Sequence, residues 1–186
     1  MASGTDNAAK PKLVVIRGNS GSGKSSVARM LQRRYDRSCA LVEQDHLRRI
    51  VLRERDVEGG LAPHLIEHVA RFALDHGRHV VVEGILAAAR YRHIISDLVR
   101  DHRGEAYVFY LDVPLEETLR RHAQRPQASE FTAQDMRSWY LPCDVLGMDC
   151  EQVIGPLPTL DALEEMIARR AGFLSRRAAQ TDASST

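Results

Sequence analysis

Eight consecutive residues, Gly18 to Ser25, have the types and spacing needed to bind phosphate groups. They match G-x-x-x-x-G-K-[ST], a loop whose backbone N–H groups surround a phosphate chain. Lys24 can reach the β- and γ-phosphates, and the hydroxyl of Ser25 can bind Mg²⁺. We therefore expect nucleotide contacts from Gly18, Asn19, Ser20, Gly21, Ser22, Gly23, Lys24, Ser25 and Ser26.

The segments on either side of this loop support the interpretation. The apolar run 13–16 predicts a strand before the loop, and residues 26–35 have the apolar spacing of a helix after it. A helix that starts at the loop points the positive end of its dipole at a bound anion. The alternative is a Gly/Ser-rich turn that carries a lysine by chance, and the strand-loop-helix context disfavours it.

A second chemically informative residue is Glu83, which ends a predicted buried strand next to Gly84. A carboxylate in this position could hold Mg²⁺ through water or contact a second substrate. The alternative is a solvated glutamate beside a turn glycine. Because ligands bind beyond the carboxyl ends of parallel strands, we expect Glu83, Asp45 and Asp112 to converge on the phosphate-binding loop.

The elements that must position these residues follow from the apolar pattern. The expected strands are 13–16, 39–43, 79–82, 106–111 and 152–154. The expected helices are 26–35, 46–53, 63–73, 90–99, 114–124, 132–140 and 159–170. Strands that are apolar enough to be covered on both faces, and that alternate with helices, predict an α/β fold. We expect an open, parallel, five-stranded sheet flanked by helices on both faces.

Composition places limits on the organisation and the partners. The 186 residues suggest one domain, which we expect to cover 11–171, with flexible ends at 1–10 and 172–186. With 26 Lys+Arg and 25 Asp+Glu, the net charge of +1 makes duplex nucleic acid and anionic membranes poor candidate partners. Three cysteines without metal-ligand spacing, and no apolar leader or spanning segment, favour the cytoplasm, where ATP is available.

Residues from Lys12 to Arg170 resemble the P-loop kinases. The resemblance is to the small single-domain branch that contains chloramphenicol phosphotransferases, gluconate kinases, polynucleotide 5′-hydroxyl kinases and zeta toxins. It implies the P-loop NTPase fold with a short helical lid at about 120–140. It also implies ATP and Mg²⁺ as cofactors, and transfer of the γ-phosphoryl group to a hydroxyl of an acceptor.

The resemblance places a catalytic carboxylate just after the second strand, where this chain has Asp45. That carboxylate would orient the acceptor hydroxyl and take its proton. Its alternative role is to cap the helix that follows, and the two roles can coexist. Arg49, four residues on, could hold an anionic or polar acceptor, or form an ion pair with Asp45. Arg90, Tyr91 and Arg92 are weaker candidates for acceptor contacts.

The expected lid carries two further candidates, Arg121 and Arg125. Residues 119–126, Leu-Arg-Arg-His-Ala-Gln-Arg-Pro, resemble the L-x-R-x-x-x-R pattern at the lid base of nucleoside monophosphate kinases. The two arginines are four apart and share a helix face. The resemblance implies that Arg121 lies over the adenine and that Arg125 reaches the transferring phosphate as a catalytic residue. An exposed basic helix end is the alternative.

The residues therefore predict an ATP- and Mg²⁺-dependent kinase that phosphorylates a hydroxyl of a small molecule, either a metabolite or an antibiotic. A polynucleotide 5′-hydroxyl kinase or a UDP-sugar kinase could use the same residues, although the balanced charge disfavours nucleic acid. A regulatory nucleotide switch or ATPase without an acceptor is the alternative from a different class. The short chain leaves little room for the extra subdomain of a motor or AAA+ protein. The sequence predicts neither the acceptor nor the oligomeric state.

Overall fold

The structure, a computed structural model, describes residues 10–102, 104–123, 131–156 and 159–173. Five parallel strands form one sheet in the order β2-β3-β1-β4-β5. The strands are β1 (Lys12–Gly18), β2 (Cys39–Glu43), β3 (His79–Gly84), β4 (Glu105–Leu111) and β5 (Glu151–Ile154). The helices are α1 (Lys24–Tyr35), α2 (Ala62–Asp75), α3 (Ala88–Asp101), α4 (Leu115–His122), α5 (Ala133–Trp139) and α6 (Leu160–Arg170). The expected fold class is confirmed.

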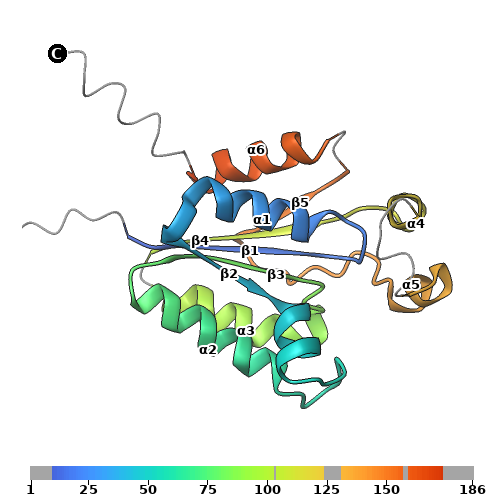
Figure 1. Cartoon of the computed structure of the whole chain (residues 1–186), viewed down its shortest axis with the longest axis horizontal. Helices are drawn as coiled ribbons and strands as arrows, with labels where there is room; N and C mark the ends of the chain where they lie inside the picture. The colour runs from blue at the N-terminus through green and yellow to red at the C-terminus, as the bar shows by residue number, and fades with distance from the viewer. Residues whose placement is uncertain (1–9, 103, 124–130, 157–158, 174–186) are drawn as a thin grey trace, which may run out of the picture.

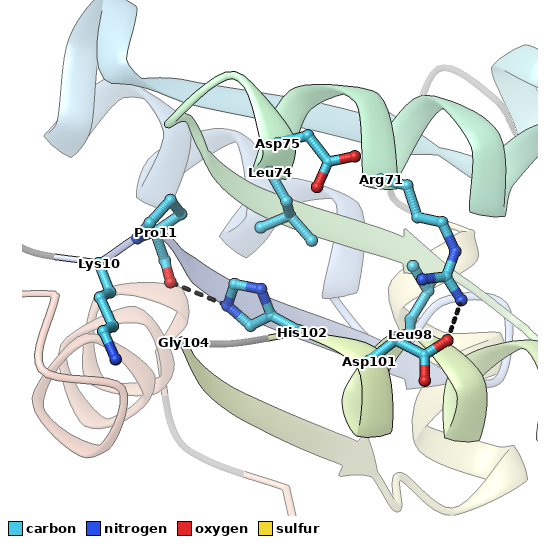
Figure 2. Close-up of a pocket in the computed structure, with 9 residues that line it drawn as sticks. All are labelled: Lys10, Pro11, Arg71, Leu74, Asp75, Leu98, Asp101, His102 and Gly104. Carbon is cyan, nitrogen blue, oxygen red and sulfur yellow. Dashed lines mark hydrogen bonds and ion pairs between the residues drawn. The ribbon is translucent and has the colours of Figure 1, made fainter.

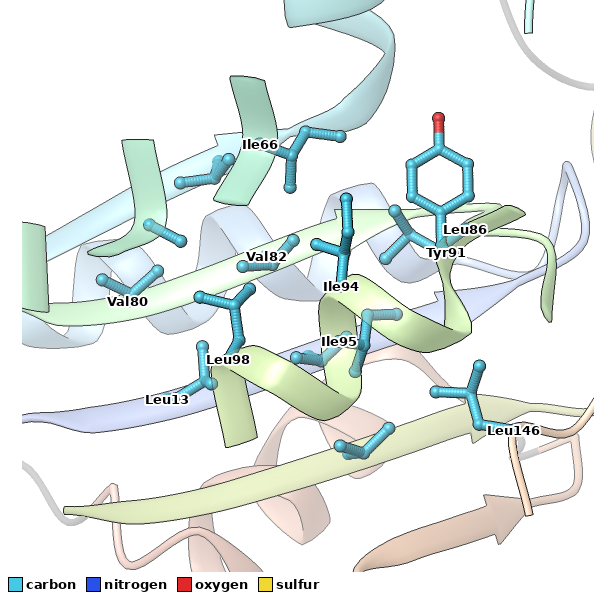
Figure 3. Close-up of a cluster of buried hydrophobic side chains, with 14 of the residues drawn as sticks. Leu13, Ile66, Val80, Val82, Leu86, Tyr91, Ile94, Ile95, Leu98 and Leu146 are labelled. Atoms are coloured by element: carbon cyan, nitrogen blue, oxygen red, sulfur yellow. The ribbon is translucent and has the colours of Figure 1, made fainter. Parts of the chain in front are cut away.

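Helices cover both faces of the sheet, with α1 and α6 on one face and α2 and α3 on the other (Figure 1). The central strand β1 supplies fully buried side chains to both layers, because successive residues of a strand point to opposite faces. Leu13 and Val15 pack with α2 and α3 (Figure 3), whereas Val14 and Ile16 pack with α1 and α6. This double burial explains why the four consecutive residues 13–16 of β1 are all apolar.

The segment after β2 differs from the expected helix 46–53. It forms one π-helical turn, η2 (His46–Val51), in which the N–H of Leu52 donates to the carbonyl of Leu47 at 2.9 Å. The side chain of Asp45 caps no N–H of this turn, so the expected capping role is wrong. Its carboxylate instead accepts a hydrogen bond from Arg48 at 2.9 Å. Asp45 itself lies at the surface.

Helix α2 starts earlier than expected, at Ala62, with Pro63 in its first turn. The carboxylate of Glu54 accepts hydrogen bonds from the N–H groups of Leu61, at 3.2 Å, and Ala62, at 2.6 Å. A carboxylate at a helix N-terminus satisfies N–H groups that have no partner within the helix. Glu54 therefore fixes the loop between η2 and α2.

The two edges of the sheet have different surroundings. At the amino edge, between α2 and α3, a cavity of about 430 Å³ is lined by Lys10, Arg71, Asp101, His102 and neighbouring residues (Figure 2). The phosphate-binding loop lies at the opposite, carboxyl edge, together with α4 and α5 (Figure 1). This amino-edge cavity is thus separate from the residues expected to bind a nucleotide.

The chain after α6 ends its described part at Phe173, which is fully buried with its ring 4.2 Å from that of Tyr35. Most of the two ends that were expected to be flexible, 1–9 and 174–186, lies outside the described residues. Among the described helices, none combines the length and the apolar composition needed to cross a bilayer.

Candidate active site

The phosphate-binding loop is pressed closely against β4 and α4. Gly18 and Gly21 have φ values of 147° and 82°, which residues with a Cβ rarely adopt. A Cβ on Gly18 would lie 2.7 Å from the carbonyl oxygen of Leu111, and one on Gly21 would lie 2.8 Å from that of Thr118. The two glycines therefore allow the loop to curve in a space that no side chain could share. A curved backbone of this kind fits a phosphate group.

Lys24 and Ser25 form the first turn of α1, directly after the loop. The Nζ of Lys24 donates to the backbone carbonyl of Asn19 at 3.4 Å, so the ammonium lies beside the loop. The hydroxyl of Ser25 donates to Oε2 of Glu83 at 3.0 Å. Hydroxyl and carboxylate oxygens are ligands that Mg²⁺ prefers. The N-terminus of α1 favours binding of an anion. These residues therefore fit both a nucleotide phosphate and its metal ion.

Glu83 is almost completely buried, with 3% of its surface exposed. Burial raises the pKa of its carboxyl group, while the charge of Lys24 and the hydrogen bond from Ser25 act in the opposite direction. The neighbouring carboxylates of Glu43 and Asp45 raise this pKa further. The net direction is upward, so the site holds a carboxylate whose charge is unfavourable until a cation balances it.

Glu83→Gln is expected to stabilise the metal-free protein at neutral pH. The folded state holds the Glu83 proton to a higher pH than the unfolded chain, whose glutamate pKa is about 4.3. Folding stability is therefore lost as the pH rises from that value through the raised pKa of the folded state. Glutamine carries no charge and escapes this loss. Urea unfolding in EDTA over a pH series measures the difference, and a variant that falls progressively below wild type as pH rises would contradict it.

Asp45 lies at the same edge of the sheet as Glu83. It closely follows Glu43 of β2, and Glu43 pairs with Glu83 of the neighbouring strand β3. Its side chain is 64% exposed and forms the ion pair with Arg48. Arg49 is the next residue of η2 and is also exposed. The structure thus brings both Lys24 and Asp45 within electrostatic range of Glu83 and leaves the Asp45 carboxylate accessible to solvent.

Arg121 contacts the phosphate-binding loop from α4. Its Nη1 donates to the carbonyl of Ser22 at 3.3 Å, and its Nε donates to Glu117 at 2.6 Å. Glu117 also binds Arg120, which faces solvent on the same helix. Arg121 therefore lies beside the loop, and its expected position over the adenine stays a prediction. Arg125 lies outside the described residues, so its role also stays a prediction.

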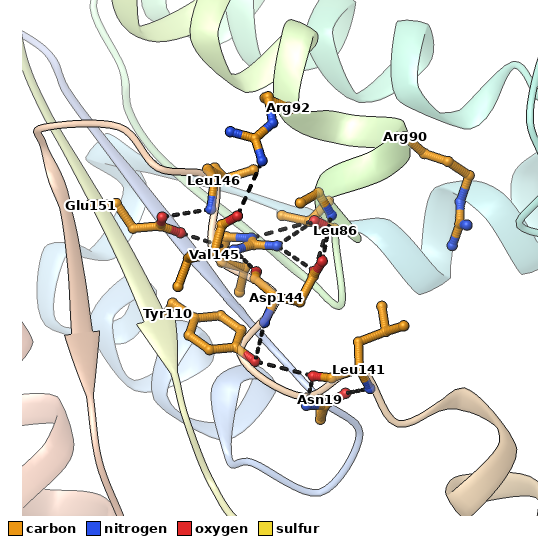
Figure 4. Close-up of polar contacts among 12 residues, drawn as sticks. Asn19, Leu86, Arg90, Arg92, Tyr110, Leu141, Asp144, Val145, Leu146 and Glu151 are labelled. Atoms are coloured by element: carbon orange, nitrogen blue, oxygen red, sulfur yellow. Dashed lines mark hydrogen bonds and ion pairs between the residues drawn. The ribbon is translucent and has the colours of Figure 1, made fainter.

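A buried arginine, Arg17, is the main residue of this edge that sequence reasoning missed. Figure 4 shows the residues that bind it, Leu86, Asp144 and Glu151. Its guanidinium donates to the carboxylates of Asp144, at 2.6 Å, and Glu151, at 2.9 Å, and to the backbone carbonyl of Leu86. It also lies 5.0 Å from the ring centroid of Tyr110. In the sequence, the feature that could have identified Arg17 is the position of a charged residue between an apolar strand and Gly18. Arg17 thus joins β1 to three other segments directly before the loop.

Gln44 is a second missed residue and sets the path of the chain after Glu83. It is 2% exposed, and its Oε1 accepts a hydrogen bond from the N–H of Leu86 at 3.1 Å. Leu86 has a φ of 47°, a strained conformation for a residue with a Cβ. A Cβ on Gly84 would collide with the Gln44 side chain. Gln44 and the glycine therefore fix the end of β3, from which Glu83 projects.

The weaker acceptor candidates hold neighbouring loops in place. Arg90 forms an ion pair of 2.7 Å with Asp56, and the hydroxyl of Tyr91 donates to the same carboxylate at 3.1 Å. Arg92 donates to the carbonyl of Val145 at 3.3 Å. The N-terminal part of α3 thus fixes the loop before α2 and the segment before β5.

Comparisons with known proteins agree with this geometry. The model of the family described as AAA domain matches residues 13–140. No curated protein matches the sequence. The chain is similar in structure to the tunicamycin resistance protein of Deinococcus radiodurans, with 19% identity, a TM-score of 0.60, and coverage of 87% of this chain and 96% of that one.

Two further solved structures have similar coverage. The Mycobacterium tuberculosis APS kinase in complex with AMPPNP and APS has 21% identity and a TM-score of 0.62, covering 87% of this chain and 97% of that one. A gluconokinase from Sinorhizobium meliloti 1021 has 18% identity and a TM-score of 0.59, covering 88% and 95%. At these identities the likeness shows the fold alone, which is the α/β fold of the P-loop NTPases. Because the family match covers well over half of the 186 residues, the chain belongs to the family described as AAA domain.

Proposed function

We propose that this protein is an ATP- and Mg²⁺-dependent kinase that transfers the γ-phosphoryl group to a hydroxyl of a small molecule. The observation that carries the proposal is the contact between Ser25 and Glu83 at 3.0 Å, beside Lys24 and within electrostatic range of Asp45. A phosphate cradle, a metal site and an accessible carboxylate at one edge are the parts that phosphoryl transfer to an alcohol requires. A regulatory ATPase would not need the exposed Asp45.

The residues have separate roles in this proposal. Lys24 and the loop N–H groups would bind the β- and γ-phosphates, and Ser25 with Glu83 would hold Mg²⁺, directly or through water. The bound metal ion would neutralise charge on the phosphate groups. Asp45 would orient the acceptor hydroxyl and accept its proton. Its exposure on the solvent side of η2 supports a role toward a second substrate that arrives from solution.

The fold neighbours support a kinase and leave the acceptor open. One is a tunicamycin resistance protein, one an APS kinase and one a gluconokinase, so their names point to chemically different compounds. The net charge of +1 supports a small molecule over a polynucleotide. Transfer from labelled ATP should therefore be screened over hydroxylated metabolites, antibiotics, nucleosides, UDP-sugars and 5′-hydroxyl oligonucleotides. ATP hydrolysis without transfer to any acceptor class would favour the regulatory ATPase.

Asp45→Asn is expected to slow phosphoryl transfer about 10²- to 10⁴-fold, because asparagine cannot accept the hydroxyl proton. ATP affinity should be retained, since the residue lies outside the phosphate-binding loop. Stability should change by no more than about 0.5 kcal/mol, because the Asp45 side chain is largely exposed. Single-turnover transfer and equilibrium nucleotide binding measure the two effects.

A matched control is Asp97→Asn on α3. Asp97 forms an i,i+3 ion pair with Arg100, as Asp45 does with Arg48, but it lies in the part of α3 that leads to the amino edge. Asp97→Asn should leave both transfer and binding unchanged. Equal activity of the two variants would remove Asp45 from its proposed role.

A further inference from the structure

The segment Leu141–Leu146, here called the return segment, carries the chain from α5 back toward β5. It is bound by side chains on both sides of the first glycine of the phosphate-binding loop (Figure 4). Arg17 precedes Gly18 and binds Asp144, whereas Asn19 follows it and binds Leu141. The loop and the return segment are therefore joined at two points, although they lie more than 120 residues apart in the chain.

Asn19 makes a two-point contact with the backbone of Leu141. Its Nδ2 donates to the Leu141 carbonyl at 2.8 Å, and its Oδ1 accepts from the Leu141 N–H at 2.9 Å. The asparagine is 3% exposed, so water competes little for these bonds. The side chain occupies the first variable position of the G-x-x-x-x-G-K-[ST] motif and is committed to Leu141.

The same residue also contacts Lys24. The backbone carbonyl of Asn19 accepts the hydrogen bond from the Lys24 ammonium at 3.4 Å. A phosphate group bound in the loop would compete for that ammonium and would order the loop backbone. Asn19 thus contacts the phosphate-binding lysine through its main chain and the return segment through its side chain.

Helix α5 ends two residues before Leu141, so the position of Leu141 limits that of the helix. Asn19 and Ser20 line one small cavity together with Met136 and Trp139 of α5, which places the helix directly over the loop. At its other end the return segment is held by the buried Arg17–Asp144 ion pair. With that end fixed, the end that leads to α5 is held at Leu141 by Asn19, from the loop, and by the Tyr110 hydroxyl, from β4.

We propose that Asn19 is a positioning residue that couples the phosphate-binding loop to α5. Ordering of the loop by nucleotide is transmitted through the Asn19 side chain to Leu141 and orders α5 over the site before the acceptor binds. The inference rests on the proposed function, because it requires nucleotide binding at the loop. It assigns to the Asn19 side chain a role in positioning α5, which is separate from the expected binding of phosphate by the backbone of the loop.

The chain offers a direct reporter of this coupling, because its single tryptophan is Trp139, the last residue of α5. Trp139 is 46% exposed, so a diffusing quencher such as acrylamide can reach it. In the wild type, a nonhydrolysable ATP analogue with Mg²⁺ should reduce quenching of Trp139. It should also slow hydrogen exchange of Leu141 and α5 by about 5- to 150-fold, the usual range for coupled sites.

Asn19→Ala should still bind the analogue but lose both responses at saturation. Tyr110→Phe is the matched control, because the Tyr110 hydroxyl donates to the Leu141 carbonyl at 3.3 Å and accepts from the Asp144 N–H at 3.2 Å without belonging to the loop. It should lower the thermal midpoint and retain both nucleotide responses. A purely structural role for Asn19 would give the same pattern as Tyr110→Phe.

The outcomes separate this inference from the proposed function. A direct titration first establishes that the wild type binds the analogue, and absence of binding would overturn the proposed function together with the inference. If binding occurs but Trp139 and α5 do not respond, the coupling is wrong while the kinase proposal stands. Full responses in saturated Asn19→Ala would likewise overturn the role of Asn19. If Asn19→Ala binds too weakly to saturate, Asn19→Ser, which keeps one hydrogen-bonding group, should give a partial response, and an undiminished one would overturn the inference.

Discussion

Replacing Lys24 with alanine is expected to lower phosphoryl transfer about 10²- to 10³-fold, the usual cost of removing one preorganised donor from a developing charge. The ammonium lies beside the loop, where it contacts the Asn19 carbonyl at 3.4 Å, and it is the cation positioned to reach the β- and γ-phosphates. Loss of this charge should weaken binding of ATP as well as transfer. Steady-state transfer and analogue titration measure the two effects.

Lys10→Ala is the appropriate control for this change. It removes the same charge from the cavity at the amino edge of the sheet, away from the phosphate-binding loop (Figure 2). Transfer by Lys10→Ala should equal that of the wild type. Full activity of Lys24→Ala would contradict the assignment of the entire site, because a phosphate-binding loop of this type needs its lysine to bind the phosphates.

Replacing Arg17 with methionine is expected to cost roughly 3–5 kcal/mol of folding stability, as removal of one partner of a buried ion pair does. Methionine fills much of the space but leaves the carboxylates of Asp144 and Glu151 without their cation. The Leu86 carbonyl also loses its donor. Urea unfolding of the nucleotide-free protein should show the loss as a lower midpoint.

The matched control is Arg169→Met, which breaks an exposed ion pair with Glu165 on α6. Such pairs contribute about 0–1 kcal/mol. Removing the carboxylates together with Arg17 should not restore full stability, because Asp144 also accepts the Ala88 N–H and Glu151 accepts the N–H groups of Leu146 and Gly147. A loss for Arg17→Met no larger than that for Arg169→Met would show that the buried network contributes little.

Much of the fold could be predicted because the local spacing of apolar residues indicates which face of a helix or strand is buried. The strand 39–43 was expected and is observed with the same bounds, and each expected strand and helix has a counterpart in the structure. In the part of the chain that the structure describes, the type of an expected element differs only at η2, where a regular helix was expected and a π-helical turn is observed. The segment contains bonds that apolar periodicity does not predict: Arg48 binds the Asp45 carboxylate and the Glu54 carbonyl, and the Glu54 N–H donates to the Arg48 carbonyl.

The candidate site divides in the same way. Gly18 to Ser25 form a contiguous motif, so their role could be predicted from spacing alone. Glu83 could be predicted because a carboxylate at the end of a buried strand is unusual. The partners of Arg17, by contrast, lie 127 and 134 residues away in the chain, and only the folded sheet brings them together. The same holds for Asn19 and Leu141, whose pairing spans 122 residues.

The bond between Asn19 and Leu141 uses only the main chain of Leu141. Any residue with a backbone N–H can stand at this position, and proline alone lacks the donor. The side chain at position 141 is therefore free to change while the join to the phosphate-binding loop persists. Such an arrangement would let related chains vary the surface beside the phosphate-binding loop while the loop itself keeps its position.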